Sequence, residues 1–161
     1  ECHNPFADFM SGEQPYLARA SRGDEGRARM RQQMRESVMV DVYLSGTNAI
    51  TLDGELVNID GMGNRVAAML FGPGKVIVVA GANKIVSNLD VAMRRIKDTA
   101  APMTAKMLGH EPPCTKLGTC VPAKGGHCYH PHRICCGTVI LNGQYDKDRI
   151  HVVIIGEELG F

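Results

Sequence analysis

Apolar runs alternate along this chain with polar stretches that favour helices. Four apolar runs predict strands, over residues 38–44, 75–81, 138–141 and 150–155. The first of these is nearly continuous, as expected of a strand buried on both faces. Two shorter runs, 49–51 and 55–59, flank Leu52-Asp53-Gly54, and Asp-Gly suits a tight turn. These two runs predict a β-hairpin.

Helical stretches separate the predicted strands. Good helix formers predict helices over residues 24–37, 64–71 and 102–108. Ser87 and Asp90 have the spacing of a capping box at the start of another helix. One apolar face of that helix is marked by Leu89, Ala92, Met93 and Ile96. Residues 1–20 carry turn formers and are predicted to be a loop or arm.

Strands that alternate with helices indicate an α/β fold with right-handed crossovers. We predict a mostly parallel sheet, flanked by helices on both faces, with the hairpin as an antiparallel piece. Residues 38–161 form this domain and include a cysteine-rich loop at 114–136. Residues 1–37 form an N-terminal arm and helix, interpreted either as the remnant of a longer domain or as an interface.

Composition narrows the classes of partner. A formal net charge of +1 gives no electrostatic reason to bind nucleic acid or an anionic membrane. With no Trp, four Tyr and four Phe, the chain offers few platforms for stacking bases. No apolar run approaches the roughly 20 residues of a membrane-spanning helix. The N-terminus lacks the pattern of a signal peptide, and the first residue is not Met, which indicates a processed chain or a fragment. The cysteines are clustered and not spread as in a secreted disulfide scaffold, so we place the protein in the cytoplasm.

The segment Gly46–Arg65 is rich in Gly, Asn and Asp and leads directly into a helix. Glycine permits close backbone approach, and Arg can bind a carboxylate or phosphate with two donors. Loops that follow strands in open α/β sheets also meet at the edge where ligands bind. We therefore predict that a ligand is bound by Thr47, Asn48, Asp60, Gly61, Gly63, Asn64, Arg65, Asn83 and Lys84. The alternative for residues 60–65 is a tight β–α turn with an Asn cap and an Arg65–Asp60 ion pair. No catalytic residue is assigned.

Five of the six cysteines lie between residues 114 and 136. Thiolates are soft ligands suited to zinc or iron–sulfur centres, and such clustering favours metal over disulfides. The metal ligands are predicted to be Cys114, Cys120, Cys128 and Cys135. Cys135 is preferred to its neighbour Cys136 because two adjacent cysteines do not easily bind one ion. The alternative is a set of reduced, half-buried cysteines, or one disulfide, in an irregular loop.

Several motifs together resemble the lactate utilization (LUD) domain family. They are Gly46-Thr47-Asn48-Ala49-Ile50-Thr51, Gly54–Gly61, Gly63-Asn64-Arg65-Val66-Ala67-Ala68, Gly72-Pro73, Val76–Val79, Asn83-Lys84-Ile85-Val86, Ala101-Pro102, Arg133-Ile134-Cys135, Val152-Val153, Gly156-Glu157 and Leu159-Gly160. The resemblance spans about Asp41 to Phe161 and is nearest to short, stand-alone members with a cysteine motif. It implies the α/β fold of the NagB/RpiA/CoA-transferase-like superfamily.

The sequence departs from the family pattern in three places. Seven residues separate Cys120 from Cys128, where the family has a short C-x2-C. Thr104 and Met107 stand where Asn and Arg are expected, which weakens that helix as a ligand contact. A preceding strand–helix portion with a Gly-Gly-Ser loop is not found, which suggests either a chain that lacks the N-terminal part of the fold or a pocket completed by other means.

Two functions follow from these features. The first is a LUD protein that binds a small carboxylate or phosphorylated ligand in lactate or carboxylate utilization, with an iron–sulfur or zinc centre nearby. It would be one component of a lactate-oxidising oxidoreductase, with partner subunits or as a homo-oligomer. The alternative is a non-catalytic binding or assembly module with a structural zinc site.

Overall fold

The computed structural model describes residues 23–121 and 128–161. The chain divides into two compact units, Glu1–Ser37 and Val38–Phe161. The described part of the first unit is helix α3 (Gly23–Glu36), which confirms the helix predicted over 24–37. Acidic residues in its first turn and Arg35 in its last turn complement the helix dipole. The loop or arm predicted for residues 1–20 lies outside the described residues.

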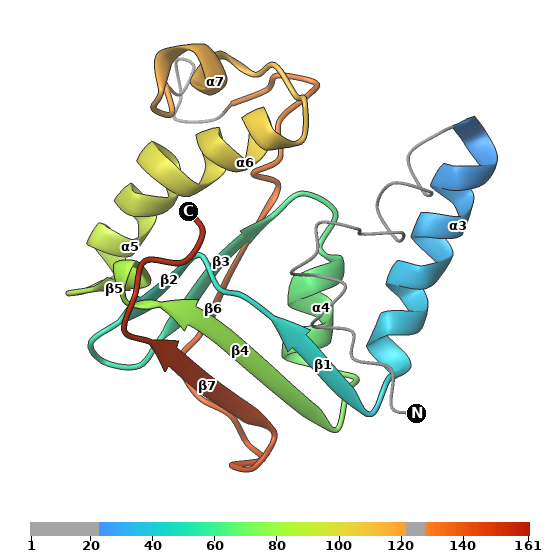
Figure 1. Ribbon diagram of the computed structural model, residues 1–161, viewed down its shortest axis with the longest axis vertical. Coiled ribbons are helices and arrows are strands. Elements are labelled where there is room, and N and C mark those ends of the chain that lie inside the picture. Colours follow the sequence, from blue (N-terminus) through green and yellow to red (C-terminus); the bar gives the residue numbers. More distant parts are fainter. Residues whose placement is uncertain (1–22, 122–127) are drawn as a thin grey trace. The chain divides into compact units, whose positions relative to one another are not determined.

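The second unit carries the α/β architecture (Figure 1). A 3-10 turn, η1 (Ser37–Met39), joins the units and is followed by β1 (Val42–Ser45), β2 (Ala49–Thr51), β3 (Leu56–Asp60), α4 (Asn64–Leu70), β4 (Lys75–Gly81), the 3-10 turn η2 (Ala82–Lys84), β5 (Ile85–Val86), α5 (Leu89–Arg95), the π-helical turn η3 (Ile96–Ala100), α6 (Ala101–Met107), α7 (Pro113–Leu117), β6 (Gly137–Leu141) and β7 (Ile150–Ile155).

The strands form two sheets. One is parallel with the order β1-β4-β7, and the other is mixed with the order β5-β2-β3-β6. Strands β2 and β3 pair antiparallel, which confirms the predicted hairpin, and the Thr51 amide donates to the Glu55 carbonyl across the turn at 3.0 Å. Gly54 has φ +89° there, a conformation that glycine adopts without strain. The α/β class with a mostly parallel sheet is therefore confirmed, and the mixed sheet is an addition to it.

Two apolar clusters hold together three layers, namely the parallel sheet, the mixed sheet and the α5–α6 helices. The first cluster lies between the sheets and joins Ile50 and Leu56 to Met69 of α4 and to Val76 and Val78 of β4. The second lies between the mixed sheet and the α5–α6 helices and contains Ala49, Val57, Ala92, Ile96 and Ala101. Strands β2 and β3 are buried because both of their faces are covered. The predicted apolar helix face of α5 is confirmed by the same cluster.

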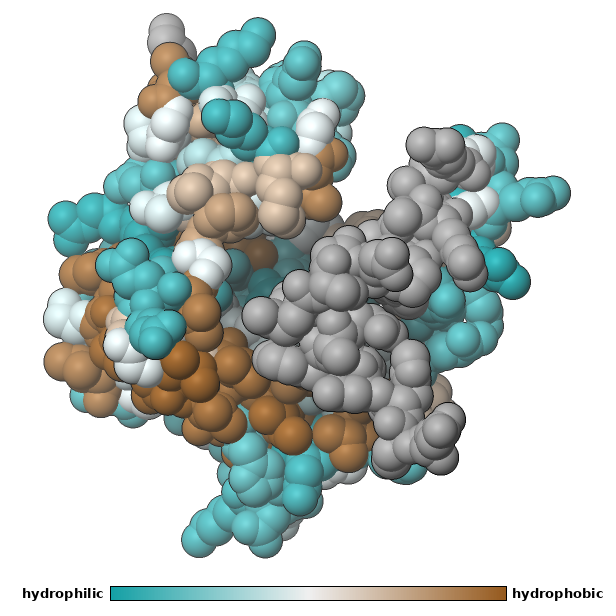
Figure 2. All heavy atoms as spheres, viewed as in Figure 1, coloured by the Kyte–Doolittle hydropathy of each residue, from teal (hydrophilic) through white to brown (hydrophobic). Residues whose placement is uncertain are grey.

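The prediction for residues 38–44 is wrong in two respects. The strand begins only at Val42, because residues 37–39 form a 3-10 turn, and alternate residues of β1 are exposed. Val42 is 54 % exposed and Leu44 is 57 % exposed. The parallel sheet is thus buried at Val76 and Val78 of its central strand β4, while its edge strand β7 is exposed along most of its length. The other face of this sheet shows apolar surface (Figure 2).

The helical layer also differs from the prediction. The N-cap of α5 is Asn88, whose side chain accepts a hydrogen bond from the Val91 amide at 3.0 Å, so the predicted capping box at Ser87 is wrong. Helices α5 and α6 run on through η3 instead of being separate. The cysteine loop, expected to be irregular, contains α7. Its C-cap Gly118 has φ +75°, which ends this helix.

Candidate functional site

The polar segment predicted to bind a ligand is organised around Asn58 and Arg65. Asn58 lies on β3 with 0 % exposure, and its Oδ1 accepts from the Thr47 hydroxyl at 3.2 Å and from the Asn48 amide at 3.3 Å. Arg65 Nη1 donates to the same oxygen at 2.5 Å and to the Gly46 carbonyl at 3.1 Å. These bonds join the end of β1 to the hairpin and to α4.

Arg65 is held by the protein itself. Its Nε and Nη2 donate to Asp60 Oδ1 at 3.0 and 2.7 Å, and Nη2 also reaches Asn48 Oδ1 at 3.1 Å. Asp60 Oδ2 accepts from the Val66 amide at 3.1 Å and so satisfies the first turn of α4. The Arg65–Asp60 pair of the alternative interpretation is therefore present. The N-cap of α4 is Gly63, with φ +83°, and no side chain caps it, so the Asn cap of that interpretation is wrong.

Gly61 serves a packing role. A Cβ atom on Gly61 would lie 3.3 Å from the Ile134 carbonyl oxygen, so the missing side chain lets the cysteine loop approach. The Cys136 amide donates to the Asp60 carbonyl at 2.9 Å in the same place. Thr47 is 2 % exposed, and its hydroxyl donates within the protein. The two predicted sites are thus in direct contact at Asp60 and Gly61.

Asn83 and Lys84 follow the carboxyl end of β4 and lie beside the C-terminal segment. Asn83 Nδ2 donates to the Gly160 carbonyl at 3.0 Å, and its Oδ1 accepts from the Leu159 amide at 3.2 Å. The Lys84 ammonium is 4.0 Å from where a Cβ atom would stand on Gly46 and 3.6 Å from where one would stand on Gly160. Lys84 therefore lies at a glycine-lined edge between the first loop and the last residues of the chain.

Three cations gather around this edge. The pKa of Lys84 is lowered, first by burial and then by the neighbouring Arg95 and Arg65. Burial also lowers the pKa of Arg95, whose Nε donates to the Asn83 carbonyl at 3.0 Å and whose Nη1 donates to the Asn48 carbonyl at 2.6 Å. Among the residues that the structure describes, no acceptor pairs with the Lys84 ammonium. We call Lys84, Arg95, Arg65 and the flanking Gly46 and Gly160 the cationic edge.

Sequence reasoning missed Arg95 and Asn58. Arg95 lies in the last turn of α5, where a basic residue is ordinary, and nothing in the pattern marks it. Asn58 did carry a signal, because it is a polar residue inside an apolar strand. A buried amide in such a position usually has hydrogen-bond partners, as here.

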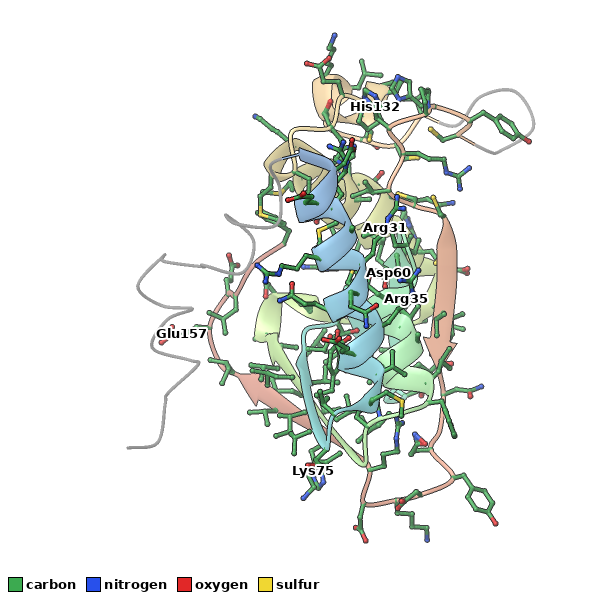
Figure 3. All side chains as sticks on the ribbon, turned by 90° about the vertical axis from the view of Figure 1, so that its right-hand side faces the viewer. Arg31, Arg35, Asp60, Lys75, His132 and Glu157 are labelled. Atoms are coloured by element: carbon green, nitrogen blue, oxygen red, sulfur yellow. The ribbon has the colours of Figure 1, made fainter. Side chains whose placement is uncertain are left out.

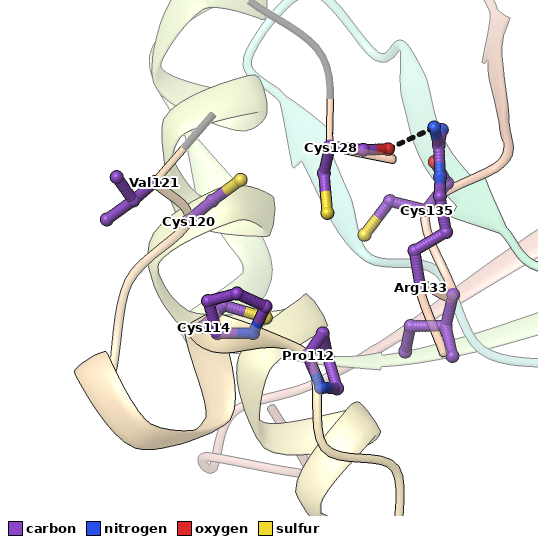
Figure 4. Close-up of a pocket in the computed structure, with 9 residues that line it drawn as sticks. Pro112, Cys114, Cys120, Val121, Cys128, Arg133 and Cys135 are labelled. Carbon is purple, nitrogen blue, oxygen red and sulfur yellow. Dashed lines mark hydrogen bonds between the residues drawn. The ribbon is translucent and has the colours of Figure 1, made fainter. Parts of the chain in front are cut away.

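The four cysteines predicted as metal ligands line one cavity of about 40 Å³. Cys114 is on α7, Cys120 follows that helix, and Cys128 and Cys135 flank the chain that returns to β6. Their sulfur atoms point toward one another (Figure 4). Cys136, the neighbour that was not chosen, is exposed and does not line the cavity.

Two of the thiols that line the cavity, Cys114 and Cys135, have a raised pKa. Burial, together with the nearby Cys120 and Cys114, raises the pKa of Cys135 to about 11. Burial and Cys120 also raise the pKa of Cys114. Each of these four cysteines is a free thiol. Such protons must leave when a metal binds, so metal binding here would release protons.

The walls of the cavity are fixed from two sides. The Cys120 amide donates to the Lys97 carbonyl at 3.1 Å, and the Thr119 hydroxyl donates to Asp98 Oδ1 at 2.6 Å, which ties this side to η3. The Cys136 amide ties the other side to β3 through Asp60. π-Helical turns occur often at functional sites. Here the turn anchors the loop that carries Cys114 and Cys120.

The four cysteines line one cavity but are not arranged as a complete metal coordination sphere. Within residues 23–121 and 128–161, no group of three or more His, Cys, Asp or Glu is arranged so that it could hold a metal ion. The four thiols nevertheless line one cavity wall. Staggered cysteine rotamers differ little in energy, so a change of rotamer can move a sulfur atom inward.

The histidines of this loop lie apart from the thiols. His132 is exposed, and its ring contacts the rings of His110 and His130 edge-on, with centroids 5.9 and 5.5 Å away. Neither His130 nor His132 lines the cysteine cavity. His127 lies outside the described residues. Among the described residues that line the cavity, the metal-ligating atoms are therefore the four cysteine sulfurs.

The fold and the two sites define an α/β protein with a polar, cationic sheet edge next to a thiol-lined loop. The LUD domain family model matches residues 11–155, so the chain belongs to the LUD domain family, which is connected with lactate utilization. The match includes α3 and begins well before Asp41, where the resemblance had been placed. Neither the curated proteins nor the solved structures include one that matches the chain. No helix among the described residues is long and apolar enough to span a membrane.

Proposed function

We propose that this protein binds a small organic anion, a carboxylate or a phosphorylated compound, in lactate or carboxylate utilization. The observation that carries the proposal is Lys84, a half-buried ammonium beside Arg95 and Arg65 that has no acceptor among the described residues. Keeping such a group charged costs free energy unless an anion pairs with it. A carboxylate or phosphate oxygen would supply that pair.

The surrounding residues would act as supports. Arg65 and Arg95 raise the positive potential, but all three side-chain nitrogens of Arg65 and two of those of Arg95 already donate to Asp60, Asn58, Asn83 and Asn48. Lys84 would therefore make the direct bond to the anion, while Gly46 and Gly160 leave room for it. The contributions of Thr47, Gly63 and Asn64 to ligand binding remain predictions.

Calorimetric titration tests the anion site. Lactate, pyruvate and inorganic phosphate would be titrated into the wild type and into Lys84→Met. We expect at least one of the three to bind the wild type and to lose roughly 10-fold or more in affinity in the variant, since a charge-assisted hydrogen bond contributes about 1.5–3 kcal/mol.

Lys75→Met is the matched control. Lys75 is exposed at the start of β4, the opposite end of that strand from Lys84, and Figure 3 shows it far from His132 of the cysteine loop. This variant should bind like the wild type. Equal binding by the Lys84→Met protein, or no binding of any of the three anions by the wild type, would contradict the proposal.

We further propose that Cys114, Cys120, Cys128 and Cys135 hold a metal centre, either iron–sulfur or zinc. The support is the cavity that all four thiols line, with sulfur as the metal-ligating atom among its described lining residues. A bound iron–sulfur cluster would supply electron transfer, which suits a component of an oxidoreductase with partner subunits. A zinc ion would brace the loop, which suits a non-catalytic assembly module.

Metal analysis combined with an absorption spectrum separates these cases. A brown protein with visible absorption indicates iron–sulfur, and a colourless protein with bound zinc indicates the structural role. Cys128→Ser should lose the metal, while Cys136→Ser, with its exposed thiol, should retain it. A wild-type protein purified without oxygen that takes up neither metal would refute the metal centre.

A further inference from the structure

Arg133 lies in the wall of the cysteine cavity, between two of its thiols in the sequence. Its two outer nitrogen atoms donate to the carbonyl oxygens of Cys128 and Cys135, as Figure 4 shows for one of them. The side chain therefore closes the chain between these two residues into a loop. The third nitrogen, Nε, is buried and donates to no acceptor among the described residues.

Among the described residues, no carboxylate forms an ion pair with the Arg133 guanidinium. Both groups that accept its hydrogen bonds are neutral carbonyls. A half-buried guanidinium in such surroundings costs free energy unless negative charge lies nearby. A divalent metal bound by four thiolates would provide it, because such a centre carries an excess of two negative charges.

We propose that Arg133 is the positioning and charge-balancing residue of the thiolate centre, and that its Nε–H is the donor to a metal-bound cysteine sulfur. The inference rests on the metal centre proposed above. The carbonyl bonds hold Cys128 and Cys135 in place. The Nε–H and the positive charge stabilise the thiolate form of the ligands. Hydrogen bonds to ligand sulfur atoms are among the means by which proteins set the properties of such centres.

Zinc and cobalt binding to the full chain tests this role. Zinc affinity would be measured by competition with a coloured chelator, and the bound Co²⁺ spectrum would report the electronic state of the sulfur ligands. Arg133→Gln should weaken zinc binding roughly 10- to 100-fold, as loss of an outer-shell partner does elsewhere. It should also shift the sulfur-to-cobalt charge-transfer band, which a purely structural role would leave in place.

Arg133→Lys separates the two parts of the role. It keeps the positive charge but loses the fork that reaches both carbonyls, so its zinc affinity should fall between those of the wild type and Arg133→Gln. It also guards against a glutamine variant that does not fold. Arg94→Gln, an exposed arginine on α5, is the control and should match the wild type.

The outcomes are distinguishable. If the wild type binds zinc and cobalt, while both Arg133 variants bind them with unchanged affinity and an unchanged cobalt band, the role of Arg133 is refuted and the metal centre stands. If the wild type binds neither metal, the metal centre fails and this inference fails with it. An affinity loss without any shift of the cobalt band would refute the Nε–H bond to sulfur.

Discussion

Asn58 joins three segments of the chain through one side-chain oxygen. The Thr47 hydroxyl, the Asn48 amide and the Arg65 guanidinium all donate to Oδ1, while the side chain is fully buried. Its Nδ2 donates to no acceptor among the described residues. A buried polar group is retained at this cost because its partners would otherwise lack an acceptor. Asn58 therefore holds together the loop after β1, the hairpin and α4 at this edge of the sheet.

Asn58→Ala should lower the free energy of unfolding by about 3 kcal/mol, since buried donors lose their acceptor and a cavity is left. Chemical denaturation followed by circular dichroism measures the change. Asn142→Ala removes an exposed amide and should change stability by less than about 0.5 kcal/mol. Equal stability of the two variants would mean that Asn58 does not organise this edge.

The C-terminal segment is the element that closes the cationic edge. The Ala82 amide donates to the Glu157 carbonyl at 3.0 Å, and Asn83 bonds to Leu159 and Gly160. This close contact requires glycine at position 81. A Cβ atom there would lie 2.4 Å from the Leu159 nitrogen and 2.7 Å from the Glu157 oxygen. The last residues of the chain are thus positioned by the end of β4.

Gly81→Ala should displace the C-terminal segment and lower the free energy of unfolding by about 1–3 kcal/mol, because these backbone atoms cannot yield as a side chain does. Affinity for the anion should fall as well, since Gly160 moves away from Lys84. Thermal melts and calorimetry measure both effects. In Gly143→Ala the added Cβ atom meets nothing within 4 Å, so both values should stay unchanged. A stable Gly81→Ala protein with full affinity would contradict this account.

The chain carries a formal net charge of only +1, but some of its positively charged side chains are concentrated at one place. Lys84, Arg95 and Arg65 lie together at one sheet edge, where Asp60 pairs with Arg65. The folded protein therefore carries local repulsion that the unfolded chain relieves. Binding of an anion would relieve it without unfolding.

Lys84→Met should raise the melting temperature at neutral pH when no anion is present. The pKa of Lys84 is lower in the folded protein than the ordinary lysine value of 10.5, so below the folded pKa both states carry the proton and folding bears the full cost of burying the charge. As pH rises through the folded pKa toward 10.5, that cost is relieved in the wild type. The advantage of the variant should therefore shrink in this alkaline range.

Thermal melts of the wild type and Lys84→Met would be recorded across this pH range. The difference between their melting temperatures removes the contribution of the other titrating groups, which the two proteins share. Saturating anion should reverse the order at neutral pH, because the ligand stabilises only the protein that binds it. A variant that is less stable than the wild type at every pH without anion would show that Lys84 is not a destabilising group.

Local patterns were sufficient for most elements of the fold. The hairpin, α4, β4, β6 and β7 were predicted because apolar periodicity and turn residues act over a few positions. The partners of individual side chains could not be predicted in this way. The donors of Arg65 are used by Asp60, Asn48 and Asn58, from a loop and a strand that only the fold brings next to it. Its role in ligand binding stays a prediction.

The sequence by itself determined the α/β class, the hairpin and the LUD family, because these depend on local periodicity and on recurring motifs. Only the tertiary structure decided that the strands separate into two sheets and that Arg95 lies beside Lys84. It also decided that Cys114 and Cys120 face Cys128, Cys135 and Arg133 across one cavity. Such contacts depend on how helices and strands pack, because packing brings together residues that are far apart in the sequence and that no local pattern connects.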